Sequence, residues 1–245
     1  MAEKKHGGKT ALVLGGSRGI GAGIVKRLAE DGAEVVFTYS SSPDRAEALA
    51  AEIAQGGGKA VALKADSGDP DQIRASVEEA VARFGRLDIL VVNAGILSRG
   101  TIDEVTLDDF DRMVAVNVRG VFAAVHYAAP KLPDGGRIVT IGSNTAVRVA
   151  FPGASVYAMT KAAVAALVKG VAIDLAPRAI TVNNIQPGPT VTDMTREHAE
   201  LVLPLIPLRR MGETREIAGL VSYLAGEEAG FITGASLTID GGYSL

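Results

Sequence analysis

The chain has 245 residues, of which 47% are hydrophobic, and it carries a formal net charge of −3. This length allows one large domain or two small ones, and the even mixture of charges excludes a nucleic-acid-binding or polybasic membrane-binding surface. The chain has no cysteine, which excludes disulfides and thiol chemistry, and its three histidines lie far apart, so no metal site is expected.

The amino-terminal residues 1–8 contain no apolar segment of the kind that a secretory signal needs, and we expect a flexible tail there. No run of about 18 apolar residues is evident, so we predict no membrane span. A cytoplasmic protein follows as the default expectation.

Residues 10–14 are aliphatic and predict the first strand, which leads directly into the glycine-rich stretch 15–21 and then a helix from residue 20 to about 31. Strand, glycine turn and helix in this order favour a dinucleotide site, because the backbone can approach the pyrophosphate and the helix N-terminus attracts it. An ordinary glycine-rich turn is the alternative. The candidate cofactor-binding residues are Gly15, Ser17, Arg18, Gly19, Ile20 and Gly21.

The second predicted strand, 34–39, ends at Tyr39, about 20 positions past the glycines, where NAD-preferring sites carry an acid. Serines follow instead, and no acid occurs before Asp44. Arg18 and the hydroxyls of Ser40 and Ser41 are suited to bind a 2′-phosphate, so the sequence predicts NADP(H). Alternatively, Arg18 is a solvated loop residue and the serines only begin the next helix.

Strands and helices alternate along the rest of the chain. The pattern predicts helices over about 43–55, 69–84, 107–129 and 213–225, a helix that ends near residue 175, and strands over 59–64, 87–92, 137–143, 179–186 and 236–240. We find no linker or repeat. The alternation predicts an α/β fold in which residues 9–245 form a single Rossmann domain, with a doubly wound parallel sheet and helices on both faces.

Several polar or small residues follow the predicted strands. Asp66, after the third strand, is suited to bind an adenine amino group, although capping its own loop is an equal alternative. The small turn Asn93-Ala94-Gly95 lets the chain pass close to a ribose, or Asn93 merely binds local backbone. The turn 187–192 follows the sixth strand at the edge where ligands of such sheets bind.

Tyr157 and Lys161 are four residues apart, which places both side chains on one face of a helix. An ammonium near a phenol favours the phenolate, so Tyr157 is a candidate general acid/base. Ser143, at the end of the fifth strand, is suited to hold a carbonyl oxygen against the tyrosine. The alternative is a chance pair on a solvated helix face. Asn117 interrupts an apolar helix, where it either joins two backbone segments or holds a water near Lys161.

Residues 193–212 form the longest stretch without a regular pattern, and it is apolar but interrupted by Pro204 and Pro207. We expect residues 188–212 to form a lid over a fairly apolar small-molecule substrate. A packed surface loop is the alternative.

These motifs, taken in order, resemble the short-chain dehydrogenase/reductase (SDR) family, and the resemblance extends from Lys9 to Leu245. The matching motifs are Gly15-x3-Gly19-x-Gly21, Asp66, Asn93-Ala-Gly95, Asn117, Ser143, Tyr157-x3-Lys161, Pro187-Gly188-x3-Thr192 and Asp240-Gly-Gly242. The resemblance implies a seven-stranded sheet and a homotetramer.

The same resemblance implies catalytic roles. Tyr157 would be the general acid/base, Lys161 would lower its pKa and bind the nicotinamide ribose, Ser143 would orient the carbonyl, and Asn117 would support a proton-relay water. The implied cofactor contacts outside the glycine loop are Tyr39, Ser40, Ser41, Asp66, Ser67, Asn93, Ala94, Gly95, Tyr157, Lys161, Pro187, Gly188, Thr190 and Thr192.

The general pattern is similar to the 3-oxoacyl-[acyl-carrier-protein] reductase branch, although the basic cluster that docks the carrier in those enzymes is reduced here to Lys131. Several stretches resemble a bacterial family member that binds cyclic-di-GMP. We therefore expect an NADPH-dependent carbonyl reductase or alcohol dehydrogenase. The alternatives are a regulatory protein that senses NADP(H) or cyclic-di-GMP, and a reductase of carrier-bound 3-oxoacyl groups.

Overall fold

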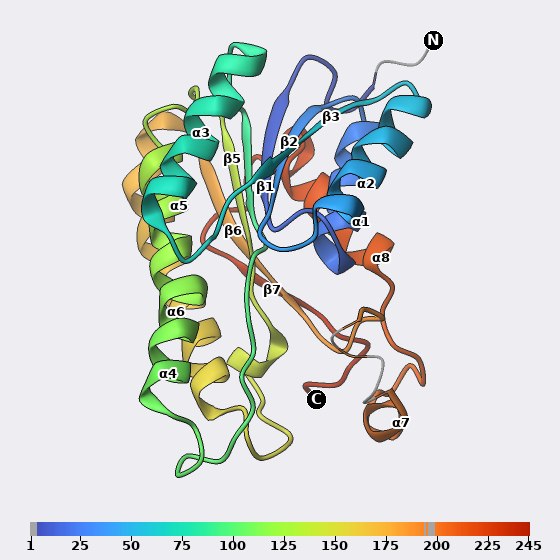
Figure 1. Ribbon diagram of the computed structural model, residues 1–245, viewed down its shortest axis with the longest axis vertical. Helices are drawn as coiled ribbons and strands as arrows, with labels where there is room; N and C mark the ends of the chain where they lie inside the picture. Colours follow the sequence, from blue (N-terminus) through green and yellow to red (C-terminus); the bar gives the residue numbers. More distant parts are fainter. Residues whose placement is uncertain (1–3, 194, 196–198) are drawn as a thin grey trace.

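Seven parallel strands form one sheet, in the spatial order β3-β2-β1-β4-β5-β6-β7, in a computed structural model that describes residues 4–193, 195 and 199–245 (Figure 1). The strands are β1 (Thr10–Leu14), β2 (Glu34–Tyr39), β3 (Lys59–Lys64), β4 (Ile89–Val92), β5 (Arg137–Ile141), β6 (Thr181–Pro187) and β7 (Ser236–Ile239). All seven expected strands are present. The central strands β1 and β4 are wholly buried, which explains why their sequences are continuously apolar.

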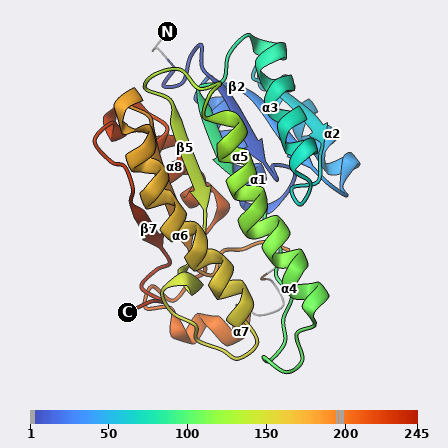
Figure 2. The same ribbon diagram turned by 90° about the vertical axis from the view of Figure 1, so that its left-hand side faces the viewer.

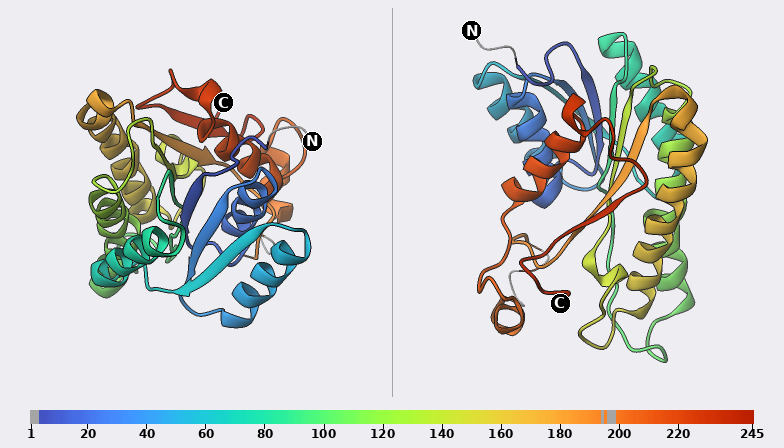
Figure 3. Two further views of the ribbon diagram at one scale, coloured as in Figure 1. Left: turned by 90° about the horizontal axis from the view of Figure 1, so that it is seen from above. Right: turned by 180° about the vertical axis from the view of Figure 1, so that it is seen from behind.

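Helices cover both faces of the sheet (Figures 1 and 3). The helices are α1 (Gly19–Glu30), α2 (Pro43–Gln55), α3 (Pro70–Phe84), α4 (Leu107–Val114), α5 (Gly120–Ala128), α6 (Ser155–Leu175), α7 (Ala199–Val202) and α8 (Thr214–Leu224). Residues of α1, α2 and α8 share one buried core, and residues of α3, α5 and α6 share the other. Alternate residues of β1 supply both cores, as the period of a strand requires.

The direction of winding reverses beside β1, which pairs with β2 on one side and with β4 on the other. The connections that leave the carboxyl ends of β1 and β4 therefore pass to opposite faces of the sheet. Such a reversal opens the crevice in which doubly wound sheets bind their ligands. The glycine-rich loop follows β1 at this point.

One expected helix, 107–129, is divided in the structure. The chain follows α4 to Val114, makes a π-helical turn over Ala115–Arg119 and continues as α5. The difference arises at Asn117, whose side chain is fully buried and bonded to a neighbouring loop. The expected irregular stretch 193–212 also contains the short helix α7 and a 3-10 turn over Leu203–Leu205.

The amino-terminal segment differs from the flexible tail that we expected for residues 1–8. Within the described part, residues 5–8 form turns, and His6 is only 2% exposed. The His6 amide donates to Asp31 O, and its Nε2 lies 3.4 Å from Ser222 Oγ on α8. Burial lowers the pKa of His6, so the imidazole is neutral in its site.

Within the described residues, one segment, 155–178, is long and apolar enough to cross a membrane, although the sequence pattern led us to expect none. This segment contains α6, which packs against the sheet with Val164, Val168 and Ala172 in the core (Figure 2). The helices of α/β cores commonly satisfy the same criterion. Packing on the sheet accounts for the apolar side chains of its inner face, whereas only 28% of the apolar window is buried and the outer face is exposed.

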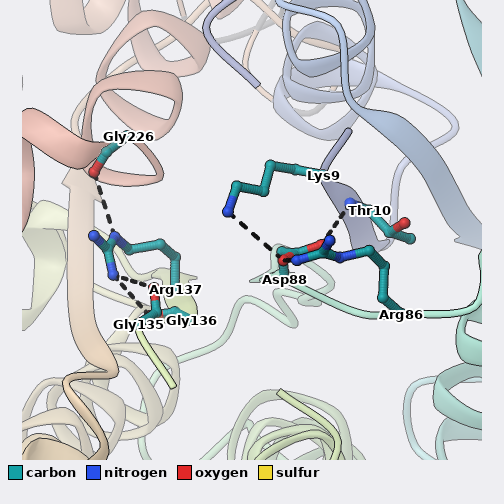
Figure 4. Close-up of polar contacts among 8 residues, drawn as sticks. All are labelled: Lys9, Thr10, Arg86, Asp88, Gly135, Gly136, Arg137 and Gly226. Carbon is teal, nitrogen blue, oxygen red and sulfur yellow. Dashed lines mark hydrogen bonds and ion pairs between the residues drawn. The ribbon is translucent and has the colours of Figure 1, made fainter. Parts of the chain in front are cut away.

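Asp88 anchors the ends of the strands opposite the crevice (Figure 4). Its carboxylate is buried and accepts hydrogen bonds from Thr10 N at 2.9 Å and from Arg86 Nε at 2.7 Å. Lys9 Nζ lies 3.9 Å away. These contacts hold the start of β1 against the start of β4, and so fix the strand pair that carries the glycine loop.

Candidate active site

A cavity of about 220 Å³ opens at the carboxyl ends of the central strands. It is bounded by the loops after β4, β5 and β6, by the start of α6 and by the segment after residue 240. The lining residues are Ile20, Leu97, Arg99, Gly142, Ser143, Asn144, Thr145, Arg148, Val149, Ala150, Phe151, Ala154, Tyr157, Pro187, Gly188, Pro189, Thr190, Thr192, Thr195, Val202 and Tyr243. Residues from the predicted cofactor and catalytic sets therefore meet at one cavity.

Ser143 and Tyr157 lie together in its wall. Ser143 directly follows β5 and begins the 3-10 turn Asn144–Ala146, where its Oγ accepts from Thr145 N at 3.2 Å and from Thr145 Oγ1 at 2.9 Å. Tyr157 lies in the first turn of α6, close enough to Ser143 for the serine hydroxyl to act on the pKa of the phenol. The Thr145 contacts hold the serine hydroxyl in place beside the phenol.

Burial raises the pKa of Tyr157, while the hydrogen bond to Ser143 and the charge of Arg99 act in the opposite direction. The net direction differs from our expectation of a lowered pKa. The reason is that the ring lies in a largely apolar wall, where the phenolate loses more hydration than its neighbours restore. In the protein without ligand, Tyr157 therefore carries its proton at neutral pH.

Lys161 is 5% exposed and lies one turn after Tyr157 on α6, as its spacing requires. Its Nζ donates to Ile141 O at 3.0 Å and lies 5.6 Å from the centroid of the Tyr157 ring. Burial lowers the pKa of Lys161 to about 8. The amine thus keeps its charge at neutral pH but loses it under mildly alkaline conditions.

Asn117 holds the loop after β4. Its Oδ1 accepts from Ile96 N at 2.9 Å, and its Nδ2 donates to Ile96 O at 2.9 Å and to Thr160 Oγ1 at 3.1 Å. A Cβ added to Gly95 would lie 3.2 Å from Lys161 Nζ and 3.4 Å from Asn117 Oδ1. Both side chains therefore face the backbone at Gly95, and the asparagine joins two backbone segments.

The glycine loop has the close packing that a phosphate-binding loop needs. Gly15 adopts a φ of +77°, and a Cβ there would lie 2.8 Å from Ala94 Cα. A Cβ on Gly21 would lie 2.0 Å from Gly15 O, the atom to which Asn93 Nδ2 donates at 2.7 Å. No side chain caps the N-terminus of α1, so its first-turn amides are available to a pyrophosphate. These residues fit the predicted dinucleotide.

The residues that we expect at the adenosine end follow β2 and β3. Tyr39 pairs in register with Lys64, which brings the Tyr39–Ser41 segment next to Asp66 and Ser67. Arg18, Ser40 and Ser41 are exposed, as binding a phosphate requires. The Asp66 Oδ1 atom accepts from Gly68 N at 2.8 Å, so Asp66 does organise its own loop.

The predicted lid, 188–212, begins at the cavity. Thr190 Oγ1 donates to Gly188 O at 3.0 Å, and a Cβ on Gly19 would lie 3.3 Å from the Thr192 methyl group. This segment therefore passes between the glycine loop and the cavity. Met194 and residues 196–198 of the expected lid lie outside the described residues.

Sequence reasoning did not predict most of the residues that line the cavity, and among those it missed are Arg99, Arg148 and Tyr243. Arg148 Nη1 donates to the main-chain oxygen of Tyr243, and the guanidinium lies 5.6 Å from the centroid of the Tyr243 ring. The two residues are 95 positions apart, so no local pattern links them.

Residues 15–244 match a family model described as enoyl-(acyl carrier protein) reductase. A short-chain dehydrogenase/reductase of Serratia marcescens is 56% identical to this chain and superposes with a TM-score of 0.96, over 98% of this chain and 100% of that one. The chain belongs to the short-chain dehydrogenase/reductase family. As the sequence motifs indicated, it is therefore related to oxidoreductases along its whole length.

Two other SDR proteins bear on the ligand. A short-chain dehydrogenase of Burkholderia cenocepacia, crystallised in complex with NADP, is 48% identical, with a TM-score of 0.96 over 98% of this chain and 100% of that one. The cyclic-di-GMP-binding biofilm dispersal mediator protein of Escherichia coli is 44% identical over 96% of this chain and 97% of its own length. Relatives with a similar sequence identity are thus named as a dehydrogenase in one case and as a nucleotide-binding mediator in the other. These are the two classes of function that the sequence left open.

Proposed function

We propose that the protein is an NADPH-dependent carbonyl reductase that transfers a hydride to a ketone or aldehyde, and that works in reverse as an alcohol dehydrogenase. The observation that carries this proposal is the Tyr157 phenol, which lies beside Ser143 and one helical turn from Lys161, in the wall of a cavity that also reaches the glycine loop at Ile20. A protein that only bound nucleotides would have no need for a proton donor there.

NADP(H) is the cofactor. The glycine loop, the uncapped N-terminus of α1 and the exposed Arg18, Ser40 and Ser41 would hold its phosphates. The chain has no carboxylate between the end of β2 at Tyr39 and Asp44, where one would repel a 2′-phosphate. Asp66 and Ser67 would lie near the adenine, Asn93, Ala94 and Gly95 near a ribose, and the segment from Pro187 to Thr192 near the nicotinamide. The relative that was crystallised with NADP supports this choice.

The bound cofactor supplies the hydride, and the side chains of the chain control the proton. Ser143 donates a hydrogen bond to the substrate carbonyl oxygen and holds it against Tyr157. Tyr157 then donates its proton to the oxygen as negative charge develops there. The Lys161 ammonium stabilises the phenolate that remains, and Asn117 holds the loop at Gly95 beside that ammonium.

The decisive experiment follows NADPH oxidation with a panel of ketones, aldehydes and a 3-oxoacyl thioester. Wild-type protein should reduce at least one carbonyl, and Tyr157→Phe should lower kcat/KM by about 10²–10⁴-fold because the proton donor is gone. NADPH affinity, measured by fluorescence titration, should change much less. Retention of most activity in Tyr157→Phe would exclude this mechanism.

A second candidate is a regulatory protein that senses NADP(H) or cyclic-di-GMP, and the relative named for cyclic-di-GMP binding favours it. Isothermal titration with cyclic-di-GMP separates the two. Tight NADPH binding without turnover of any carbonyl, together with cyclic-di-GMP binding at micromolar concentrations, would support the regulatory function. A carrier-bound 3-oxoacyl substrate remains a variant of the first proposal, and the thioester in the panel tests it.

The surroundings of the site also bear on the substrate and on the assembly of the protein. The apolar cavity walls at Leu97, Val149 and Phe151 favour a substrate with an apolar body. We expect the described part of the 188–212 segment, which lines the cavity at Pro189 and Thr190, to cover that substrate. We place the protein in the cytoplasm as a homotetramer. The exposed apolar face of α6 supports this assembly.

A further inference from the structure

Two arginines give the cavity a strong charge preference. Among the described residues that line it, Arg99 and Arg148 are the only charged ones, and no aspartate or glutamate accompanies them. The other walls are apolar side chains, hydroxyl groups and main chain. A cavity of this kind attracts anions and excludes cations.

Arg99 lies in the loop between β4 and α4 and is exposed. Within the described part of the chain it has no carboxylate partner, although its charge acts on Tyr157 and opposes the rise of the phenol pKa. Gly100 N, beside Arg99, donates to Gly153 O at 3.2 Å, and this bond fixes the Arg99 loop against the turn before α6. The backbone at Arg99 is thus held at the cavity, and the guanidinium has no carboxylate partner there among the described residues.

Arg148 lies in the loop between β5 and α6, on another wall of the cavity. It uses a single nitrogen, Nη1, for both of its hydrogen bonds, which go to the main-chain oxygens of Tyr243 and Leu245. Its guanidinium carbon lies 5.6 Å from the centroid of the Tyr243 ring. Within the described residues, Nε and Nη2 therefore keep their N–H groups for a further acceptor.

We propose that the substrate is an oxo acid: a molecule with a ketone or aldehyde group, an apolar body and a carboxylate that binds to Arg99 and Arg148. This inference rests on the proposed carbonyl reduction and specifies its substrate class. The carbonyl binds between Ser143 and Tyr157, the body lies along Leu97, Val149 and Phe151, and the carboxylate receives the guanidinium N–H groups. A guanidinium suits this role because its paired donors match the two oxygens of a carboxylate.

The test compares ligands of the same shape but different charge. 4-Acetylbenzoate and 4-acetylbenzamide are reducible ketones, and 4-ethylbenzoate and 4-ethylbenzamide are their unreactive analogues. We expect kcat/KM for 4-acetylbenzoate to exceed that for 4-acetylbenzamide at least about tenfold. In calorimetry, the NADP⁺-loaded protein should bind 4-ethylbenzoate more tightly than 4-ethylbenzamide. The preference should weaken as salt is raised, because added ions screen exposed charges.

Two arginine variants test which groups carry the preference. Arg99→Gln should reduce the ratio of kcat/KM for the acid to kcat/KM for the amide several-fold, and Arg99→Glu should reverse this preference. The Arg99 side chain has no hydrogen-bond or ion-pair partner among the residues that the structure describes, so both variants should fold. Arg148→Gln should also reduce the ratio. Arg83→Gln is the matched control, because Arg83 pairs with Glu79 on the surface of α3 and does not line the cavity.

The outcomes separate this inference from the proposed function. Equal kcat/KM and equal binding for acid and amide would overturn the oxo-acid assignment while leaving carbonyl reduction intact. Failure to reduce any ketone would overturn the proposed function, on which the assignment rests. A preference that persists in Arg99→Glu would also count against the inference.

Discussion

Among single residues, we expect Lys161 to set a measurable pH limit on the proposed reaction. Its pKa of about 8 means that the amine is charged below that pH and neutral above it, whereas the raised pKa of Tyr157 keeps the phenol protonated over the same range. We therefore expect kcat/KM for NADPH to fall as pH rises above about 8, through loss of the ammonium and not of the phenol proton. Steady-state kinetics between pH 6 and 10.5 will measure the fall.

The control lies on the same helix. Lys161→Met should lose the fall near pH 8 together with most of the activity, whereas the exposed Lys169→Met should retain both. A wild-type profile that stays flat up to pH 10 would show that the charge of Lys161 does not limit the reaction.

The proximity of Tyr157, Lys161 and Ser143 could be anticipated from the sequence because short-range rules determine it. The helical spacing of Tyr157 and Lys161 determines their contact, and Ser143 follows a strand whose end was evident. Arg148 is different, because its contact with Tyr243 crosses 95 positions and depends on how the end of the chain folds back. The raised pKa of Tyr157 was also beyond prediction, since burial and its cost are properties of the folded cavity.

At the scale of secondary-structure elements, the strand pair β1–β4 depends on Asp88. Replacing Asp88 with Asn keeps the shape of the side chain but removes the negative charge that both Arg86 and Lys9 contact. It also places an amide N–H group against the guanidinium of Arg86. We expect a loss of about 1–3 kcal/mol in the free energy of unfolding, because buried partners are left poorly satisfied. Urea denaturation will measure it, and NADPH affinity should change little because Asp88 lies at the opposite end of the strands from the glycine loop.

Asp134→Asn is the matched control for that experiment. Asp134 is 80% exposed and pairs with Arg178 on the surface, so its loss should change stability by less than about 1 kcal/mol. Equal unfolding midpoints for the two variants would mean that the Asp88 contacts do not stabilise the sheet.

Element boundaries were predictable where composition changes sharply, as at the end of α2, where a run of glycines follows Gln55. The division of the 107–129 helix was not. The sequence identified Asn117 as unusual, but the π-helical turn results from its bonds to Ile96, which is 21 residues away. The side chain enforces a local geometry that propensity alone does not contain.

At the scale of the whole molecule, the alternation of strands and helices predicted the architecture, because parallel strands require helical crossovers and these have a fixed hand. The sequence did not indicate that residues 4–8 would fold onto the domain. His6 is held by Asp31 and by Ser222 on α8, contacts that span up to 216 positions. A short polar segment carries no pattern that reveals such long-range partners.

The exposed face of α6 is a candidate contact between copies of the chain. Helices α5 and α6 both face the viewer in Figure 2. The outer face of α6 is apolar and exposed, with Met159 at 44% and Ile173 at 75% exposure, and Phe122 of α5 is 54% exposed. Ala162 and Ala166 lie between them and are small enough for two helices to approach closely. Because soluble chains seldom leave such a face in water, we expect copies of the chain to pair through it.

The prediction concerns the mass in solution. Light scattering should give about four times the 25.2 kDa of one chain, and Ala166→Arg should reduce that mass by placing a bulky charge at the centre of the paired helices. Ala48→Arg, on the exposed side of α2, is the matched control and should leave the mass unchanged. A wild-type mass of one chain at micromolar concentration would contradict the tetramer. A tetramer that persists in Ala166→Arg would show that assembly uses another face, because a charged arginine cannot be buried between closely packed helices without a partner.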